Sequence, residues 1–68
     1  MKTNDIVMKI ADTAKAKNVP SHSYSIRVEM NGSVTLKRPW CVSKTRQDRF
    51  LRQETEFEIL NRLQYFFS

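Results

Sequence analysis

Cysteine, histidine, glycine and proline are scarce in this 68-residue chain, which has one Cys, one His, one Gly and two Pro. Cys41 has no partner for an internal disulfide, and together with His22 it falls short of the ligands that a structural zinc site needs. Long apolar runs are also missing, since Lys9 and Asp12 interrupt the N-terminal segment. We therefore expect a cytoplasmic protein without a membrane segment, metal, cofactor or small-molecule substrate.

The chain does contain an excess of positive charge and enough apolar residues for one small core. Its hydrophobic fraction is 40%, its net charge +5 and its mean hydropathy −0.57. A chain of this length predicts a single small domain over residues 1–68. The charge is uneven, because residues 37–52 hold six basic residues and one acidic residue. A polyanion is the partner that this balance favours.

Helical periodicity marks the N-terminal part of the chain. Apolar residues recur there at helical spacing: Ile6, Val7, Ile10, Ala11 and Ala14. The residue before a proline is disfavoured in the helical region, so Pro20 ends the pattern. We predict a helix over residues 4–17.

Residues 24–37 alternate between apolar and polar, which predicts two antiparallel strands joined at an Asn-Gly turn. A two-residue loop would place the apolar residues of the two strands on opposite faces. A three-residue loop over residues 30–32 instead pairs Val28 with Val34. It also places Gly32 in the left-handed region that glycine tolerates. We predict the three-residue loop.

The rest of the chain predicts a connection over residues 37–42, which contains a proline, and then a long helix over residues 46–66. Thr45 followed by Asp48 resembles a capping box, and Ser43 is the competing cap. The expected fold class is α+β, in the order α-β-β-α. A two-stranded antiparallel hairpin would pack against two helices, the second of them long.

Five of the seven aromatic residues lie between Phe50 and Phe67. One face of a hairpin covers fewer than this. These side chains either fill the core of a monomer or contact a homodimer or protein partner on the second half of the long helix. The interface residues expected in the second case are Phe57, Leu60, Leu63, Phe66 and Phe67.

Basic residues gather in and before the first turns of the predicted long helix, where backbone N–H groups are unpaired. This arrangement favours phosphate binding, and the alternative is a solvated face neutralised by nearby carboxylates. Trp40 either covers the small core or stacks on a base. The expected nucleic-acid-binding residues are Lys37, Arg38, Trp40, Lys44, Arg46, Arg49 and Arg52.

Few residues suit catalysis. Cys41 has no neighbouring base, and a lone His22 without a positioned partner is ordinarily a surface residue, so we expect no enzymatic activity. The leading hypothesis is a small regulatory or accessory protein that binds DNA or RNA through phosphates. The alternative is an inhibitor or accessory module of phage or plasmid type that docks on an acidic surface of a larger protein.

Ser21-His22 precedes the first predicted strand, Gly32 lies in the turn, and Val34-Thr35 begins the next strand. These residues resemble a pattern of HicA-type messenger-RNA-cleaving toxins, over residues 21–35. The resemblance implies a fold of one helix, three strands and one helix, with a catalytic role for His22. A HicA-like ribonuclease toxin is therefore a further alternative.

Overall fold

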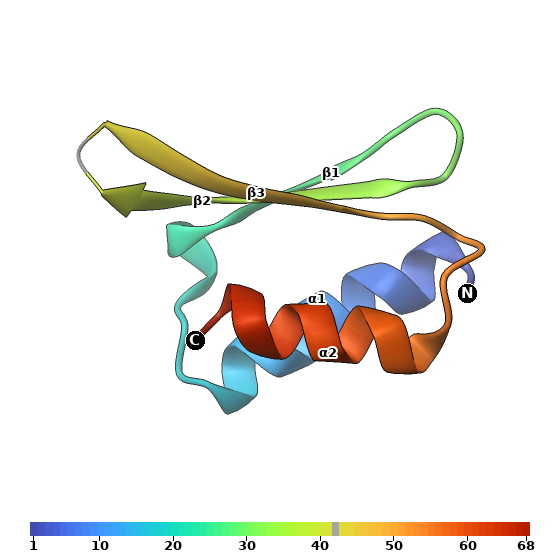
Figure 1. The fold of residues 1–68 in the computed structure, drawn as a ribbon, viewed down its shortest axis with the longest axis horizontal. Coiled ribbons are helices and arrows are strands. Elements are labelled where there is room, and N and C mark those ends of the chain that lie inside the picture. The colour runs from blue at the N-terminus through green and yellow to red at the C-terminus, as the bar shows by residue number, and fades with distance from the viewer. Residues whose placement is uncertain (42) are drawn as a thin grey trace.

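The computed structural model describes residues 1–41 and 43–68, with only the backbone of residues 40 and 41. Its elements are α1 (Thr3–Ala16), a short 3₁₀ helix η1 (Ser21–Ser23), β1 (Ser25–Val28), β2 (Val34–Cys41), β3 (Lys44–Phe50) and α2 (Glu56–Phe66). The strands form an antiparallel sheet in the order β1-β2-β3. Both helices lie on the same side of this sheet (Figure 1). The α+β class is thus confirmed.

Helix α1 agrees closely with the predicted helix over residues 4–17. It ends in a Schellman motif, in which Val19 N donates to Ala14 O at 2.8 Å and Asn18 N donates to Lys15 O at 3.1 Å. Asn18 takes a φ of 58° at this point. The chain therefore leaves the helix just before Pro20.

The β1–β2 hairpin has the predicted register. Val28 pairs with Val34, and Glu29 N donates to Ser33 O at 2.8 Å across a three-residue loop. Gly32 occupies the left-handed region with a φ of 87°. The Asn31 side chain closes the loop by accepting from Ser33 N at 3.0 Å. This register places the apolar residues of both strands on one face of the sheet.

The predicted connection over residues 37–42 is wrong up to Cys41, because β2 continues through it. Pro39 lies in the central strand, where a missing N–H group normally breaks the ladder. In this register, the backbone N–H and C=O groups of odd-numbered β2 residues point toward β1. Since β1 begins at Ser25, opposite Lys37, Pro39 has no β1 residue beside it. The strand therefore loses no hydrogen bond at this proline.

The predicted helix over residues 46–66 is wrong in its first half, and the expected two-stranded hairpin is a three-stranded sheet. Strand β3 alternates as a strand should, but two of its three residues that are not exposed, Arg46 and Asp48, are polar. Only Phe50 is a buried apolar residue. An alternation of apolar residues is the usual signal of a strand, so the sequence pattern did not indicate β3.

Helix α2 is correspondingly shorter and begins with a capping box, ten residues later than predicted. Thr55 Oγ1 accepts from Glu58 N at 3.2 Å, and the Glu58 carboxylate accepts in return from Thr55 N. The predicted cap Ser43 comes just before β3, and the other predicted cap, Thr45, is the second residue of β3. The Thr-x-x-Glu sequence was the signal for the true start of the helix.

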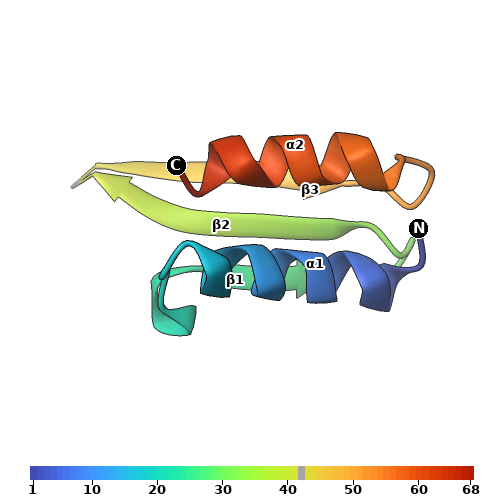
Figure 2. The same cartoon turned by 90° about the horizontal axis from the view of Figure 1, so that it is seen from below.

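The core lies between the sheet and the two helices, which run side by side in the same direction (Figure 2). An ion pair of 2.8 Å between Lys9 and Glu56 joins them, and its hydrogen bond raises the pKa of Lys9. The buried apolar residues are Ile6, Ile10, Ala14, Val34, Leu36, Phe50, Ile59, Leu63, Phe66 and Phe67.

Most of the aromatic and leucine residues that were expected at a partner interface belong to this core. Leu63, Phe66 and Phe67 are buried, and Leu60 is half-buried. Phe57 alone of that set is largely exposed, at 73%. The core therefore accounts for these residues without a partner chain, except for Phe57.

Candidate nucleic-acid interface

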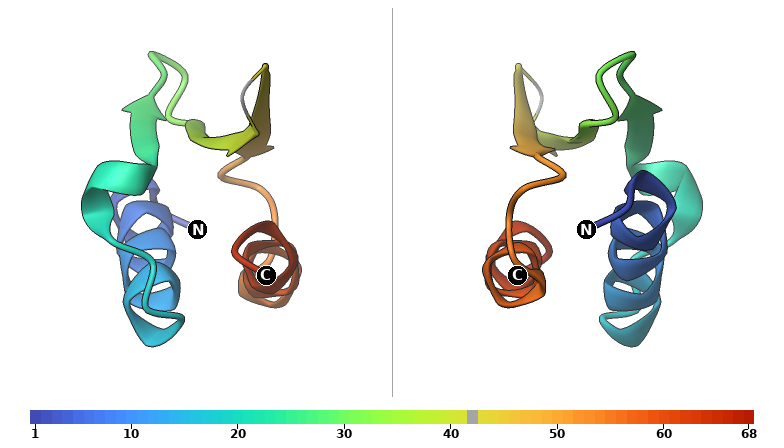
Figure 3. Two further views of the ribbon diagram at one scale, coloured as in Figure 1. Left: turned by 90° about the vertical axis from the view of Figure 1, so that its left-hand side faces the viewer. Right: turned by 90° about the vertical axis from the view of Figure 1, so that its right-hand side faces the viewer.

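The sheet has one face against the helices and one face uncovered, as the end-on views show (Figure 3). Ile26, Leu36 and Phe50 point toward the helices, so their strand neighbours point the other way. We call the uncovered side the open face. Its residues are Ser25, Arg27, Thr35, Lys37, Pro39, Thr45, Gln47 and Arg49.

Three exposed cations, Arg27, Lys37 and Arg49, stand on the open face, one from each strand. Arg27 and Arg49 flank Thr35 across the sheet, which places their backbones about 10 Å apart, or two strand spacings. Glu29 lies 3.8 Å from Arg27 and accepts from the Thr35 hydroxyl at 3.2 Å. Within the described part of the chain, Lys37 and Arg49 form no ion pair. Glu29 offsets one of the three positive charges, so the open face keeps a net positive charge of two.

A pocket of about 300 Å³ adjoins the open face where β1 begins, and it shares Ser25, Lys37, Pro39 and Thr45 with that face. We call it the cationic pocket. Its lining residues are His22, Ser23, Tyr24, Ser25, Lys37, Arg38, Pro39 and Thr45, none of them acidic. Lys37 and Arg38 are neighbours in β2, so their side chains point to opposite faces of the sheet, and the Arg38 side chain lies on the side of Phe67.

Arg38 is the half-buried member of the cationic pocket. Its guanidinium carbon lies 5.8 Å from the centre of the Phe67 ring, in a cation–π contact. Its Nε is buried and finds no hydrogen-bond acceptor among the described residues. An unsatisfied buried donor costs roughly 1–3 kcal/mol.

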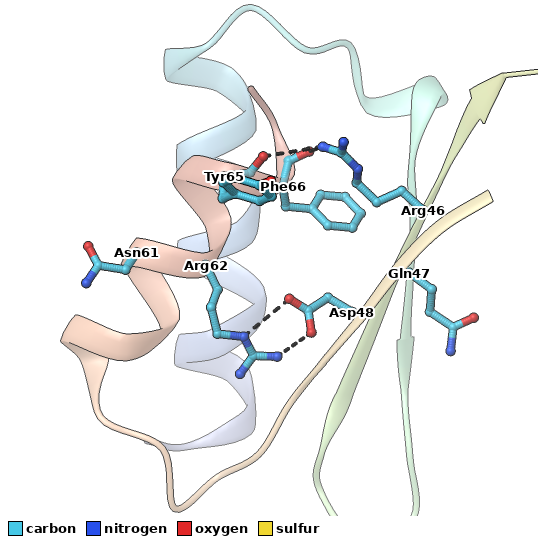
Figure 4. A pocket seen from close by; sticks show the side chains of 7 residues that line it. All are labelled: Arg46, Gln47, Asp48, Asn61, Arg62, Tyr65 and Phe66. Atoms are coloured by element: carbon cyan, nitrogen blue, oxygen red, sulfur yellow. Dashed lines mark hydrogen bonds and ion pairs between the residues drawn. The ribbon is translucent and has the colours of Figure 1, made fainter. Parts of the chain in front are cut away.

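Arg46 faces the helices and closes the end of α2. Its Nη1 donates to Phe66 O at 2.9 Å and to Tyr65 O at 3.3 Å (Figure 4). These carbonyls lie at the C-terminal end of the helix, where the macrodipole favours a cation. Arg46 therefore stabilises α2, and these contacts turn it away from the open face.

Arg62 on α2 is the centre of an ionic network that joins the helix to β3 (Figure 4). It forms ion pairs with Asp48 and Glu54 and lies 4.6 Å from the centre of the Phe50 ring. Burial alone would lower the pKa of Arg62, but hydrogen bonds and charge from both carboxylates raise it. Because Asp48 is engaged by Arg62, it does not neutralise the cations of the open face.

The same network covers part of the outer edge of β3. Arg49 N donates to the Asp48 carboxylate at 2.8 Å, Arg49 O accepts from Arg62, and Leu51 N donates to Glu54 at 2.8 Å. Satisfied edge groups are poor templates for pairing with another strand. This half of the edge is therefore protected by side chains.

The structure divides the cations predicted to form one phosphate site. Lys37 and Arg49 lie on the open face, Arg38 lies in the cationic pocket, and Arg46 binds α2. Lys44 is exposed at the start of β3, and Arg52 is exposed in the loop after it. Arg46 lies within β3 and not at the start of a helix, so the prediction of a phosphate site at a helix N-terminus is wrong. The side chains of Trp40 and Cys41 lie outside the described residues.

Two members of the site were missed in the sequence. Arg27 was not among the expected binding residues, although strand alternation places it on the polar face of the hairpin. His22 was set aside as isolated, and the return of β2 past β1 brings it to Lys37 and Arg38. Strand alternation could have identified Arg27, whereas the position of His22 beside β2 depends on the length of that strand.

The chain matches no protein-family model, and comparisons with curated proteins and with solved structures found no match. Among the described residues, neither helix has the length and apolar character needed to cross a membrane. The function is therefore argued from the geometry of the open face and the cationic pocket.

Proposed function

We propose that this protein binds nucleic acid through phosphate contacts on the open face. The supporting observation is the group of three exposed cations, Arg27, Lys37 and Arg49, on a sheet face that no helix covers. Thr45 and Gln47 lie beside them and add hydroxyl and amide donors, which phosphate oxygens accept. Contacts to phosphates carry no sequence information, so the binding is expected to be largely independent of sequence.

Salt dependence is the signature of this mode of binding. Each phosphate neutralised on duplex DNA contributes about −0.9 to the slope of log affinity against log salt concentration. Lys37 and Arg49, together with an Arg27 that Glu29 partly neutralises, predict a slope of roughly −2 to −3. Six cations in one cluster, as the sequence suggested, would have given a slope of about −5.

Replacing Arg49 with glutamine is expected to weaken binding about tenfold and to make the salt slope shallower by about one, because one charge-assisted phosphate contact is lost. Fluorescence anisotropy of a labelled duplex, measured between about 50 and 200 mM salt, gives both quantities. Lys15→Gln on α1 removes the same charge far from the open face and serves as the matched control. Equal affinities for the two variants, or binding that ignores salt, would contradict the proposal.

RNA cleavage at His22 is the second candidate, and one observation favours it. The third strand completes an order of one helix, three strands and one helix, which the resemblance to HicA-type toxins implies. His22 lines the cationic pocket together with Lys37 and Arg38. There His22 could take the proton of a ribose 2′-hydroxyl, whose oxygen attacks the adjacent phosphate, forms a 2′,3′-cyclic phosphate and expels the 5′-oxygen, which takes a proton from water. Lys37 could offset the negative charge on the phosphate.

If His22 acts in this way, expression of the protein is expected to arrest bacterial growth, and His22→Ala is expected to relieve the arrest. His22 is exposed, so the variant should fold as the wild type does. Its melting temperature provides the control. Growth that is unaffected by the wild type, or arrested equally by the variant, would exclude a catalytic His22.

A further inference from the structure

The outer edge of β3 has a protected half and a bare half. Side chains satisfy the edge groups of Arg49 and Leu51 in the second half of the strand. In the first half, the backbone N–H and C=O groups of Thr45 and Gln47 have no hydrogen-bond partner among the described residues. Unpaired edge groups of this kind are a template for another strand.

The register shows that these groups point away from the sheet. Odd-numbered β2 residues bond with β1, so the even-numbered ones bond with residues 46, 48 and 50 of β3. Residues 45, 47 and 49 therefore turn their N–H and C=O groups outward. The bonds of Arg49 N and Arg49 O agree with this alternation, because both are made to side chains and not to β2.

A pocket of about 370 Å³ lies beside the bare half of the edge, between β3 and α2 (Figure 4). We call it the edge pocket. Its surface is mainly apolar, because the charged ends of its side chains are engaged with carbonyls at the end of α2 or with one another. Its lining residues are Arg46, Gln47, Asp48, Asn61, Arg62, Tyr65 and Phe66.

A bare strand edge beside an apolar pocket suits an extended peptide. Main-chain hydrogen bonds to the edge provide affinity, and a pocket for alternate side chains provides specificity. In an antiparallel strand added to β3, the residue opposite Gln47 would bond with it and turn its side chain to the open face. The residues on either side would turn theirs toward the helices, where the edge pocket accepts apolar groups.

The charge around the edge favours acidic residues at the other positions. Arg49 lies two residues from Gln47 on the open face, within diagonal reach of a long side chain opposite Gln47. It forms no ion pair within the described part of the chain, and Lys44 is exposed at the start of the strand. A second copy of this chain would bring the same cations to the edge, which disfavours self-pairing.

We propose that the bare half of the β3 edge binds an extended acidic segment of a partner protein, paired antiparallel with residues 45–47. Its apolar residues enter the edge pocket, and they alternate with acidic residues that face Arg49. This inference does not rest on the proposed function, because its main contacts are backbone groups and a pocket that phosphate binding does not use.

A short blocked peptide of alternating glutamate and valine is the probe, and the Gln47 amide signal in a ¹⁵N-correlated NMR spectrum reports its binding. Antiparallel pairing turns the glutamate N–H groups toward β3 and the valine N–H groups toward solvent. N-methylation of the glutamates is therefore expected to weaken binding about tenfold or more, whereas N-methylation of the valines changes it by less than about twofold. Any other pattern, or no shift of the Gln47 amide, would overturn the antiparallel pairing.

Exchanges of the peptide side chains test the charge and the pocket. Lysine in place of glutamate, and serine in place of valine, are each expected to weaken binding about tenfold. Arg49→Gln should also weaken binding of the glutamate peptide, and Lys15→Gln is the control of equal charge. A lysine peptide of equal affinity would overturn the acidic partner, and a serine peptide of equal affinity would overturn the role of the edge pocket.

Gln47→Pro tests the edge from the side of the protein. The outward N–H group that it removes has no partner in the sheet, and proline is tolerated at such edge positions. We expect a melting temperature close to that of the wild type and no binding of the glutamate peptide. Full affinity in a folded Gln47→Pro would contradict the assignment, and the methylated peptides still decide if the variant does not fold.

Sedimentation equilibrium of the protein alone tests the competing occupant, a second copy of this chain. A monomer is expected at concentrations at which the glutamate peptide binds. A dimer whose formation shifts the Gln47 amide signal would assign the edge to self-association and overturn the acidic partner.

Discussion

Replacing Arg62 with methionine is expected to lower the free energy of unfolding by about 2 kcal/mol, which corresponds to a fall of about 10 °C in melting temperature for a chain of this size. The variant leaves the carboxylates of Asp48 and Glu54 without their cation and leaves Arg49 O without its donor. Breaking a fully buried ion pair costs more, about 3–5 kcal/mol. The smaller figure allows for the partial exposure of this network, in which the Arg62 side chain is 35% exposed.

Urea denaturation of the single and double variants tests this expectation. Asp48→Asn combined with Arg62→Met removes both members of one ion pair, so the double variant should lose less stability than the sum of the two single losses. An arginine is charged throughout the acid and neutral range, and the two carboxylates raise the pKa of Arg62 further. The effect is therefore expected at any such pH at which the carboxylates are ionised. Strictly additive losses would show that Arg62 and Asp48 do not stabilise one another.

Gly32→Ala is expected to lower the free energy of unfolding by about 2 kcal/mol, of which a left-handed backbone conformation accounts for roughly 1–2 kcal/mol. Gly32 has a φ of 87°, and a Cβ built there would lie 2.5 Å from Arg52 Cδ and 3.1 Å from Thr3 Oγ1. Thr3 also donates to Gly32 O at 2.6 Å, so it has little room to move. The substitution therefore strains the hairpin loop and its contact with α1.

Thermal unfolding of Gly32→Ala, Gly32→Asn and the double variant Gly32→Ala with Arg52→Ala separates the two causes. Asparagine tolerates the left-handed region better than alanine, so Gly32→Asn should be the more stable of the two single variants on conformational grounds. Removing the Arg52 side chain relieves only the close contact and should restore only part of the loss. Full recovery in the double variant would assign the effect to crowding alone, and a wild-type melting temperature for Gly32→Ala would refute the strained loop.

The parts of the fold that were predictable depend on residues close together in the chain. Helical spacing of Ile6, Ile10 and Ala14 located α1, and a parity argument on the Asn31-Gly32 turn located the register of the hairpin. The same parity placed Arg27 and Lys37 on the polar side of the sheet. The charge count also identified residues 37–52 as basic. The sequence analysis placed Arg46, Arg49 and Arg52 on a helix, whereas they lie on β3 and in the loop after it.

Strand β3 could not be found by pattern, because its partners lie elsewhere in the chain. Arg46 faces inward to reach carbonyls of residues 65 and 66, and Asp48 faces inward to reach Arg62, fourteen positions away. A strand whose inner positions are charged has no apolar alternation. Read alone, its basic residues at intervals of three were as consistent with one face of a helix.

The amino-acid sequence by itself determined α1, the hairpin register and the glycine in its loop, because near neighbours and backbone sterics decide those features. Only the tertiary structure decided that residues 44–50 form a third strand and that Arg46 binds a helix end. It alone also brought His22, Lys37 and Arg38 around one pocket. The reason is that each of these features depends on contacts between residues that are far apart in the sequence. Such contacts cannot be inferred from the spacing of residues along the chain.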